Sequence, residues 1–176
     1  MKRLLVMRHA KSSWDDPRQR DFDRPLNERG RMAAPLIAAA IAEKGWRPDV
    51  ILCSPALRTR ETLDRMKPRL GPSIPVAYRD GLYLASLDRL YSEIERLSDQ
   101  DTTALVIAHN PGVQELSLSL CDEPSCASDR FERIAIKFPT GAVTAFALPT
   151  SGWRQISPQT GTLLDFITPK GLSRSK

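Results

Sequence analysis

Two histidines and two arginines of this 176-residue chain stand where they could act on one phosphoryl group. His9 and His109 are the only histidines, and each directly follows an apolar run, in "LLVMRH" and "ALVIAH". Arg8 precedes the first histidine, and Arg58 lies shortly after a third apolar run, "DVILC". A guanidinium group can donate two parallel hydrogen bonds to phosphate oxygens, and it neutralises their charge. We therefore interpret the four residues as a candidate phosphoryl-transfer site.

The chemistry open to such a group of side chains needs no further cofactor. One neutral imidazole can attack phosphorus and carry the phosphoryl group covalently. The other imidazole, when protonated, can donate a hydrogen bond to an equatorial oxygen as charge shifts in the transition state. The two arginines supply the positive charge that a metal ion would otherwise supply, so the hypothesis includes no metal and no cofactor.

The elements that would position these side chains alternate between apolar strands and amphipathic helices. Asn27 can cap the first long helix and Gly45 fits its end, while Pro55 suits the first turn of the second. We expect strands at 4–7, 49–53, 74–78, 103–108, 142–148 and 162–168, and helices at 27–45, 55–70, 87–98 and 110–120. Fully apolar strands that alternate with helices predict an α/β fold, with a mostly parallel central sheet covered on both faces.

This sheet explains why the four residues should meet. Ligands of open α/β sheets bind beyond the carboxyl ends of the strands. Arg8 and His9 follow the first expected strand, Arg58 the second, and His109 the fourth. We expect all four side chains at the same edge of the sheet.

Length and composition describe an ordinary globular chain. The hydrophobic fraction is 41% and the charged fraction 27%, and the formal net charge is +5. We expect a single domain over residues 1–169, with residues 170–176, "KGLSRSK", as a loose basic tail. The scattered basic residues are not interleaved with aromatics, which argues against nucleic acid as the partner. No apolar run is long enough for a membrane span or a signal peptide, so we expect a cytoplasmic protein.

The three cysteines do not form a recognisable metal or disulfide pattern. Cys53 lies inside an apolar run, and Cys121 and Cys126 have no histidine nearby, so we expect structural roles for all three. A cysteine phosphatase would need five residues between its cysteine and arginine. "CSPALR" leaves four between Cys53 and Arg58, and Arg60 lies one residue too far. We set that chemistry aside.

Several segments together resemble the histidine phosphatase superfamily, most closely its SixA-type phosphohistidine phosphatase branch. The segments are "LLVMRHAKSSW" (4–14), "DFDRPLNERGR" (21–31), "DVILCSPALRTRET" (49–62), "LY" (82–83) and "VIAHNPG" (106–112). They occur in the expected order over about the first two-thirds of the chain, and the expected strands and helices agree with them. From about Asp122 onward the sequence matches less distinctively.

The resemblance implies a three-layer, phosphoglycerate mutase-like fold and a role for each site residue. His9 would be the nucleophile that becomes phosphorylated, and Arg8 and Arg58 would bind the phosphate. His109 would complete the pocket and stabilise the transferring group. Lys11 and Ser12 would line its mouth. The implied substrate is a protein-borne phosphohistidine.

One departure from the wider superfamily bears on the substrate. Metabolite phosphatases and mutases of this kind carry an acidic proton donor after the third strand, where this chain reads "YRDGLYLASLDRLY" without an acid in the expected place. An imidazole leaving group can be protonated beforehand, whereas an alkoxide needs the acid. The absence therefore favours a phosphohistidine over a sugar phosphate.

Two other functions stay open. A small-metabolite phosphatase or mutase-like enzyme would use the same pocket with a proton donor at Asp21, Asp23 or Asp80. A non-catalytic module would keep the pocket only to bind phosphorylated partners, although such a module has no need of a nucleophile.

Overall fold

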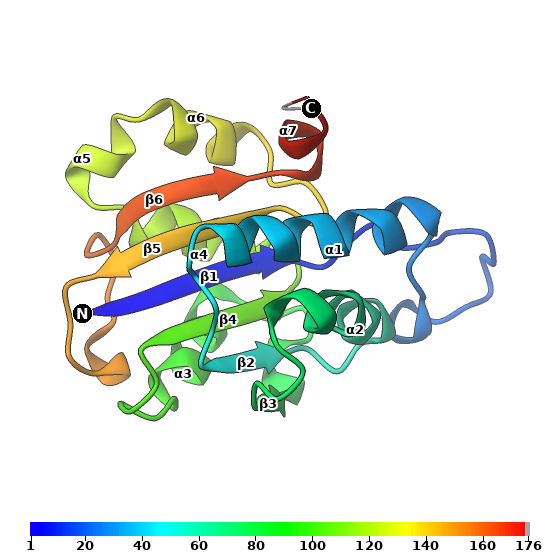
Figure 1. The fold of residues 1–176 in the computed structure, drawn as a ribbon, viewed down its shortest axis with the longest axis horizontal. Coiled ribbons are helices and arrows are strands. Elements are labelled where there is room, and N and C mark those ends of the chain that lie inside the picture. The colour runs from blue at the N-terminus through cyan, green and yellow to red at the C-terminus, as the bar shows by residue number, and fades with distance from the viewer. Residues whose placement is uncertain (175–176) are drawn as a thin grey trace.

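The computed structural model describes residues 1–174 and contains one six-stranded sheet (Figure 1). Its strand order is β3-β2-β4-β1-β5-β6. The strands are β1 (Lys2–Arg8), β2 (Val50–Cys53), β3 (Val76–Tyr78), β4 (Thr103–Ala108), β5 (Val143–Leu148) and β6 (Thr162–Ile167). β1 pairs in parallel with β4, as does β2 with β4 and with β3, while β5 runs antiparallel to β1 and β6. The expected mostly parallel sheet is confirmed.

Helices cover both faces of this sheet and make the expected three layers (Figure 1). The main helices are α1 (Glu28–Glu43), α2 (Leu57–Leu70), α3 (Leu87–Glu95) and α4 (Gly112–Leu120). Successive residues of β1 alternate between two cores, since Leu4 and Val6 pack with α3 and α4, and Leu5 and Met7 pack with α1 and α2. Burial on both faces explains why the parallel strands read as continuous apolar runs.

The start of α1 is fastened to the segment that follows β1. Asn27 caps the helix as expected, its side chain accepting a hydrogen bond from the Gly30 amide at 3.0 Å. The Asn27 amide donates to the Lys11 carbonyl at 3.0 Å. A Cβ atom at Gly30 would collide with that same carbonyl, so only glycine allows the helix to approach so closely. The residues after His9 are thereby held against α1.

The last third of the chain contains helices that the sequence patterns did not indicate. α5 (Glu123–Cys126) and α6 (Asp129–Ile136) lie between β4 and β5 in the chain, each capped by a side chain, from Asp122 and Ser128 respectively. Short 3-10 helices occur as η1 (Asp21–Asp23), η2 (Asp80–Leu82) and η3 (Trp153–Gln155).

The C-terminal segment differs from the loose tail expected for residues 170–176. α7 (Pro169–Arg174) is helical, and Leu172 packs against the core on the α1 side of the sheet. One apolar residue in a short basic stretch is a weak signal, which is why the composition suggested a tail. The final two residues of the expected tail lie outside the described residues. Within residues 1–174, no helix combines the length and apolar character required to cross a membrane.

Candidate active site

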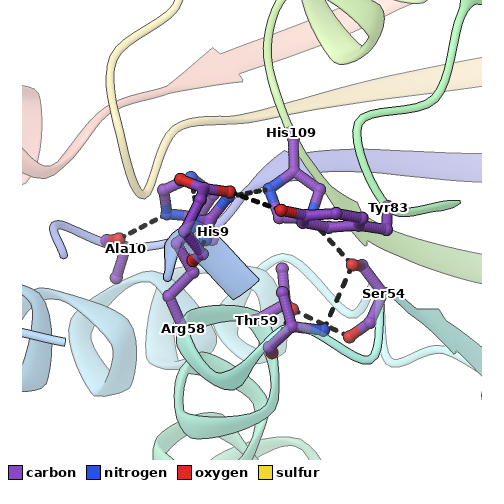
Figure 2. Close-up of polar contacts among 9 residues, drawn as sticks. His9, Ala10, Ser54, Arg58, Thr59, Tyr83 and His109 are labelled. Carbon is purple, nitrogen blue, oxygen red and sulfur yellow. Dashed lines mark hydrogen bonds and ion pairs between the residues drawn. The ribbon is translucent and has the colours of Figure 1, made fainter. Parts of the chain in front are cut away.

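The strand ends bring the four predicted residues together at one edge of the sheet. Arg8 is the last residue of β1 and is paired in register with Ala108, the last residue of β4, so His9 and His109 leave the sheet side by side. Their ring centroids are 5.2 Å apart. Arg58 reaches both rings from the first turn of α2 (Figure 2).

The backbone and the ring of His9 are both held in place. Its amide donates to the Ala108 carbonyl at 3.1 Å, and its own carbonyl accepts from Gly141 at 2.9 Å. The ring Nδ1 lies 2.7 Å from the Ala10 carbonyl. A carbonyl can only accept, so Nδ1 carries the proton and Nε2 presents its lone pair.

Burial keeps this imidazole neutral. His9 is 6% exposed, and burial, together with repulsion from Arg58 and Arg8, lowers its pKa to about 3. A hydrogen bond to Ala10 and the charge of Asp21 oppose that shift without cancelling it. At neutral pH, Nε2 is therefore an unprotonated nitrogen inside a cationic pocket, which is the state a nucleophile requires.

Arg58 is the centre of the hydrogen-bond network. The guanidinium is almost fully buried, and its Nε lies 3.3 Å from His9 Nε2. Nη1 donates to the Asp21 carbonyl at 2.6 Å, and Nη2 donates to the Asp21 carboxylate at 3.0 Å. Nη2 also lies 3.1 Å from His109 Nδ1. A phosphate that binds here must replace some of these partners.

Arg8 brings a second guanidinium with donor capacity to spare. Its Nη1 donates to the Phe138 carbonyl at 3.0 Å. Its Nε is buried without a hydrogen-bond partner among the described residues. Burial and the nearby Arg58 charge both lower the pKa of Arg8. Two like charges held so close favour a dianionic ligand between them.

His109 is neutral in this structure, and its tautomer is fixed by two neighbours. Its Nδ1 faces Arg58, a donor only, so Nδ1 accepts and Nε2 carries the proton. That Nε2–H donates to the Ser54 hydroxyl at 2.7 Å. Burial first, then the proximity of His9 and Arg58, lowers the pKa of His109 to about 3. The protonated form expected from the sequence would have to arise when an anionic ligand is present.

Asp21 is the carboxyl group that reaches this pocket. It comes from η1, after the long loop that follows His9, and accepts hydrogen bonds from Arg58 and, at 2.6 Å, from the Tyr83 hydroxyl. Burial would raise the pKa of Asp21, but the hydrogen bonds from Tyr83 and Arg58 outweigh it and lower the pKa. The carboxylate is ionised at neutral pH.

Of the three acids that the sequence left open, only Asp21 lines the pocket. Asp23 pairs with Arg20 at 2.9 Å, and Asp80 begins η2; neither is a lining residue. The segment after the third strand contributes Tyr83 instead. The Tyr83 ring packs edge-on against His109, with centroids 5.4 Å apart.

The pocket itself is small, with a volume of about 210 Å³. We call Arg8, His9, Arg58 and His109 its floor, and the loop residues Lys11, Trp14, Arg24 and Leu84 its rim. Ser12, Asp21, Asn110 and Thr140 complete the lining. Lys11 thus lies at the mouth, where the sequence resemblance placed it, whereas Ser12 lines the pocket as a buried residue.

Sequence reasoning missed three functional contributions. Ser54 fixes the His109 tautomer, Tyr83 holds Asp21, and the Thr62 hydroxyl accepts from the Ala10 amide at 3.0 Å. Ser54 and Thr62 lie in segment 49–62 and Tyr83 lies in "LY", both of which resemble the family. The resemblance therefore included these residues but did not indicate what each of them does. Each role depends on a contact between distant parts of the chain.

The cysteines lie apart from this chemistry. Burial raises the pKa of Cys53 to about 12, so the thiol stays protonated, and its Sγ donates to the Ser54 carbonyl at 3.3 Å. Cys121 is also buried, and Cys126 is exposed; all three are free. Within residues 1–174, no group of three or more His, Cys, Asp or Glu side chains is placed to hold a metal ion.

Comparison with known proteins agrees with this geometry. Residues 4–83 match the family model described as histidine phosphatase superfamily (branch 1). An Agrobacterium tumefaciens protein assigned as phosphohistidine phosphatase SixA is 30% identical, with a TM-score of 0.77 over 96% of this chain and 98% of that one. A Nakamurella multipartitia protein with the same assignment is 28% identical, with a TM-score of 0.80 over 96% of each chain. An uncharacterized protein of Mycobacterium tuberculosis is 34% identical over 93% of this chain and all of its own length.

Proposed function

Because the chain belongs to the histidine phosphatase superfamily, in its SixA-type branch, we propose that it removes the phosphoryl group from phosphohistidine in proteins. His9 carries the group as a covalent intermediate. The observation that carries the proposal is the unprotonated His9 Nε2, which lies 3.3 Å from Arg58 Nε at the floor of a small pocket that Arg8 also lines.

The first step transfers the phosphoryl group to the protein. The His9 Nε2 lone pair attacks phosphorus while the bond between phosphorus and the substrate imidazole breaks. The electron pair of that bond leaves with the imidazole, which departs neutral because its other nitrogen already carries a proton. Arg8 and Arg58 bind the equatorial oxygens of the phosphoryl group, and His109 lies beside the same oxygens.

The second step returns His9 to its starting state. A water molecule that replaces the leaving group attacks phosphorus, and the bond from phosphorus to Nε2 breaks. The Asp21 carboxylate, ionised and in the same pocket, accepts the proton of that water. The products are inorganic phosphate, neutral His9 and a protonated Asp21, which then releases its proton to water.

The protonation state of Asp21 supports a substrate with a P–N bond. An alkoxide leaving group needs a protonated acid, and a positioned acid accelerates such a step by about 100- to 10,000-fold. Asp21 is held ionised by Tyr83 and Arg58, so it is better suited to accept a proton than to donate one. Phosphohistidine avoids this difficulty because its leaving group is protonated beforehand.

The size of the pocket supports a substrate that is presented from a protein surface. Pockets that enclose small metabolites have volumes of about 300–1,000 Å³. A pocket of about 210 Å³ takes the phosphoryl group and the adjacent ring and leaves the remainder of the substrate outside.

The test is the release of phosphate from a phosphohistidine-bearing protein, beside a panel of phosphosugars, with a metal chelator present throughout. We expect rapid release from phosphohistidine alone, and a loss of about 1,000-fold or more in kcat for His9→Ala. An acid-labile phosphoenzyme should be trapped with wild type and be absent from the variant. Near-normal turnover by His9→Ala would overturn the nucleophile assignment.

A second candidate function rests on the presence of Asp21 in the pocket. A small-metabolite phosphomonoesterase would use the same His9 step with Asp21 as its acid. This function predicts preference for a phosphosugar and a loss of about 100-fold or more for Asp21→Asn on that ester. If neither substrate class is turned over and no phosphoenzyme forms, the pocket serves binding alone.

A further inference from the structure

The rim of the pocket contains two large apolar side chains that remain in water. Trp14 is 69% exposed and Leu84 is 55% exposed, and both line the same pocket as the catalytic histidines. Neither is needed for the phosphoryl chemistry of the floor. Leaving large apolar groups in water forgoes the stabilisation that burial would provide, so two such groups around one pocket indicate a binding surface.

The Trp14 indole is held in position by a stacked arginine. The guanidinium carbon of Arg24 lies 3.3 Å from the indole ring centroid, which covers one face of the ring. Because the side chain is still largely exposed, its other face is open. Arg24 Nη1 is buried and has no hydrogen-bond partner in residues 1–174. A ring fixed in this way loses little conformational entropy when it binds a ligand.

Leu84 stands in the same pocket through an unfavourable backbone conformation. Its φ of 48° lies in the left-handed region, which is strained for a residue other than glycine. The neighbouring residues hold it there, since Tyr83 is hydrogen-bonded to Asp21, and Ala85 packs tightly against Gly112 of α4. Strain of this kind persists where the surroundings require it, and here it places an apolar side chain at the pocket mouth.

We propose that Trp14 and Leu84 form the subsite for the leaving group and determine the specificity of the enzyme for a planar ring. With the phosphoryl group on the floor, the substrate imidazole lies at the mouth, where the open indole face can stack on it. A serine or sugar carbon chain offers no such ring. The inference rests on the proposed function and adds the residues that select its substrate.

The experiment compares two P–N substrates with different leaving groups. One is a phosphohistidine-bearing protein, and the other is phosphoramidate, whose leaving group is ammonia and has no ring. The measured quantity is the ratio of the two kcat/KM values. We expect Trp14→Ala to lower this ratio about tenfold, mainly through KM for the protein substrate, and Leu84→Ala to lower it about threefold. Trp14→Phe, which keeps a flat ring, should retain most of the wild-type ratio.

The controls separate this inference from the proposed function. Met32 of α1 is similarly exposed, at 64%, but does not line the pocket, so Met32→Ala should leave the ratio unchanged. An unchanged ratio in Trp14→Ala and Leu84→Ala, with wild type active on phosphohistidine, would overturn the leaving-group subsite and leave the function standing. Equal losses on both substrates would also overturn it. Wild type that cleaves phosphoramidate but not phosphohistidine would overturn the proposed function, and the subsite with it.

Discussion

The floor and the rim of the pocket are built by different means. Floor residues stand at strand ends or in the first turn of α2, and His9, Arg58 and His109 are nearly fully buried, with Arg58 hydrogen-bonded to both rings. Rim residues belong to loops, and Lys11, Trp14 and Leu84 are exposed. A buried, interlocked floor fixes the reacting atoms, whereas an exposed rim can vary the substrate without disturbing them.

The same contrast appears in the electrostatics. On the floor, burial holds both imidazoles neutral, and the guanidinium of Arg58 pairs with the carboxylate of Asp21. On the rim, the Lys11 and Arg24 charges can attract an anionic substrate, but water screens them. Substitutions on the floor should therefore lower the rate of the chemical step strongly, and substitutions on the rim should lower it weakly.

An arginine-to-lysine pair tests this contrast most directly. Arg58→Lys keeps the charge but loses the planar donors that reach Asp21 and both histidines, so kcat/KM should fall about 100-fold. Arg24→Lys loses only the stacked support of Trp14, and we expect a fall of about threefold. Steady-state kinetics on a phosphohistidine-bearing protein measures both.

Unfolding curves of these two variants show whether each remains folded. Equal effects of the two substitutions in folded protein would mean that the floor and the rim are not separate in function.

Two serine substitutions extend the comparison to the hydrogen bond that His109 donates to Ser54. Ser54→Ala removes the acceptor of the His109 Nε2 proton, and kcat should fall about tenfold with KM nearly unchanged. Ser117 is a buried core serine with its hydroxyl 2.7 Å from the Val113 carbonyl, so Ser117→Ala should cost comparable stability and leave kcat unaltered. If Ser117→Ala lowered kcat as much, stability alone would account for the effect of Ser54.

The floor could be predicted from the sequence, because strand ends in a parallel sheet have a fixed geometry. Once Arg8, His9 and His109 were placed after apolar runs, the sheet rule put them at one edge, and the register of β1 with β4 confirms it. The apolar runs themselves follow from burial on both faces. The positions of the apolar runs were therefore enough to predict where the floor residues lie.

The rim and the acid could not be predicted in the same way. Asp21 reaches the pocket only because a loop of irregular path returns to Arg58, and Tyr83 holds it from a third segment. Loop paths have no periodicity from which they could be read. The helices α5 and α6 went unrecognised because they are short, with four and eight residues, although Asp122 and Ser128 cap them with ordinary residues.

The smallest effect we expect is spectroscopic, and it tests the electrostatic basis of the comparison. The chain has two histidines, so its NMR spectrum should contain two sets of imidazole signals, which the His9→Ala and His109→Ala variants assign. Both pKa values are lowered from 6.5 to about 3, chiefly by burial. Neither set of signals should shift between pH 8 and pH 5 in the free protein.

The same pKa values predict how stability depends on pH. Between pH 6.5 and about 3 the unfolded chain binds protons that the folded imidazoles do not, so the contribution of each buried histidine is full above pH 6.5 and falls as the pH is lowered. The loss is at most about 1.4 kcal/mol per pH unit for each histidine.

Inorganic phosphate, placed between Arg8 and Arg58, should raise the pKa of His109 because its charge favours the imidazolium. Titration of either histidine near pH 6.5 in phosphate-free buffer would show that the floor is open to water there and that burial does not hold that histidine neutral.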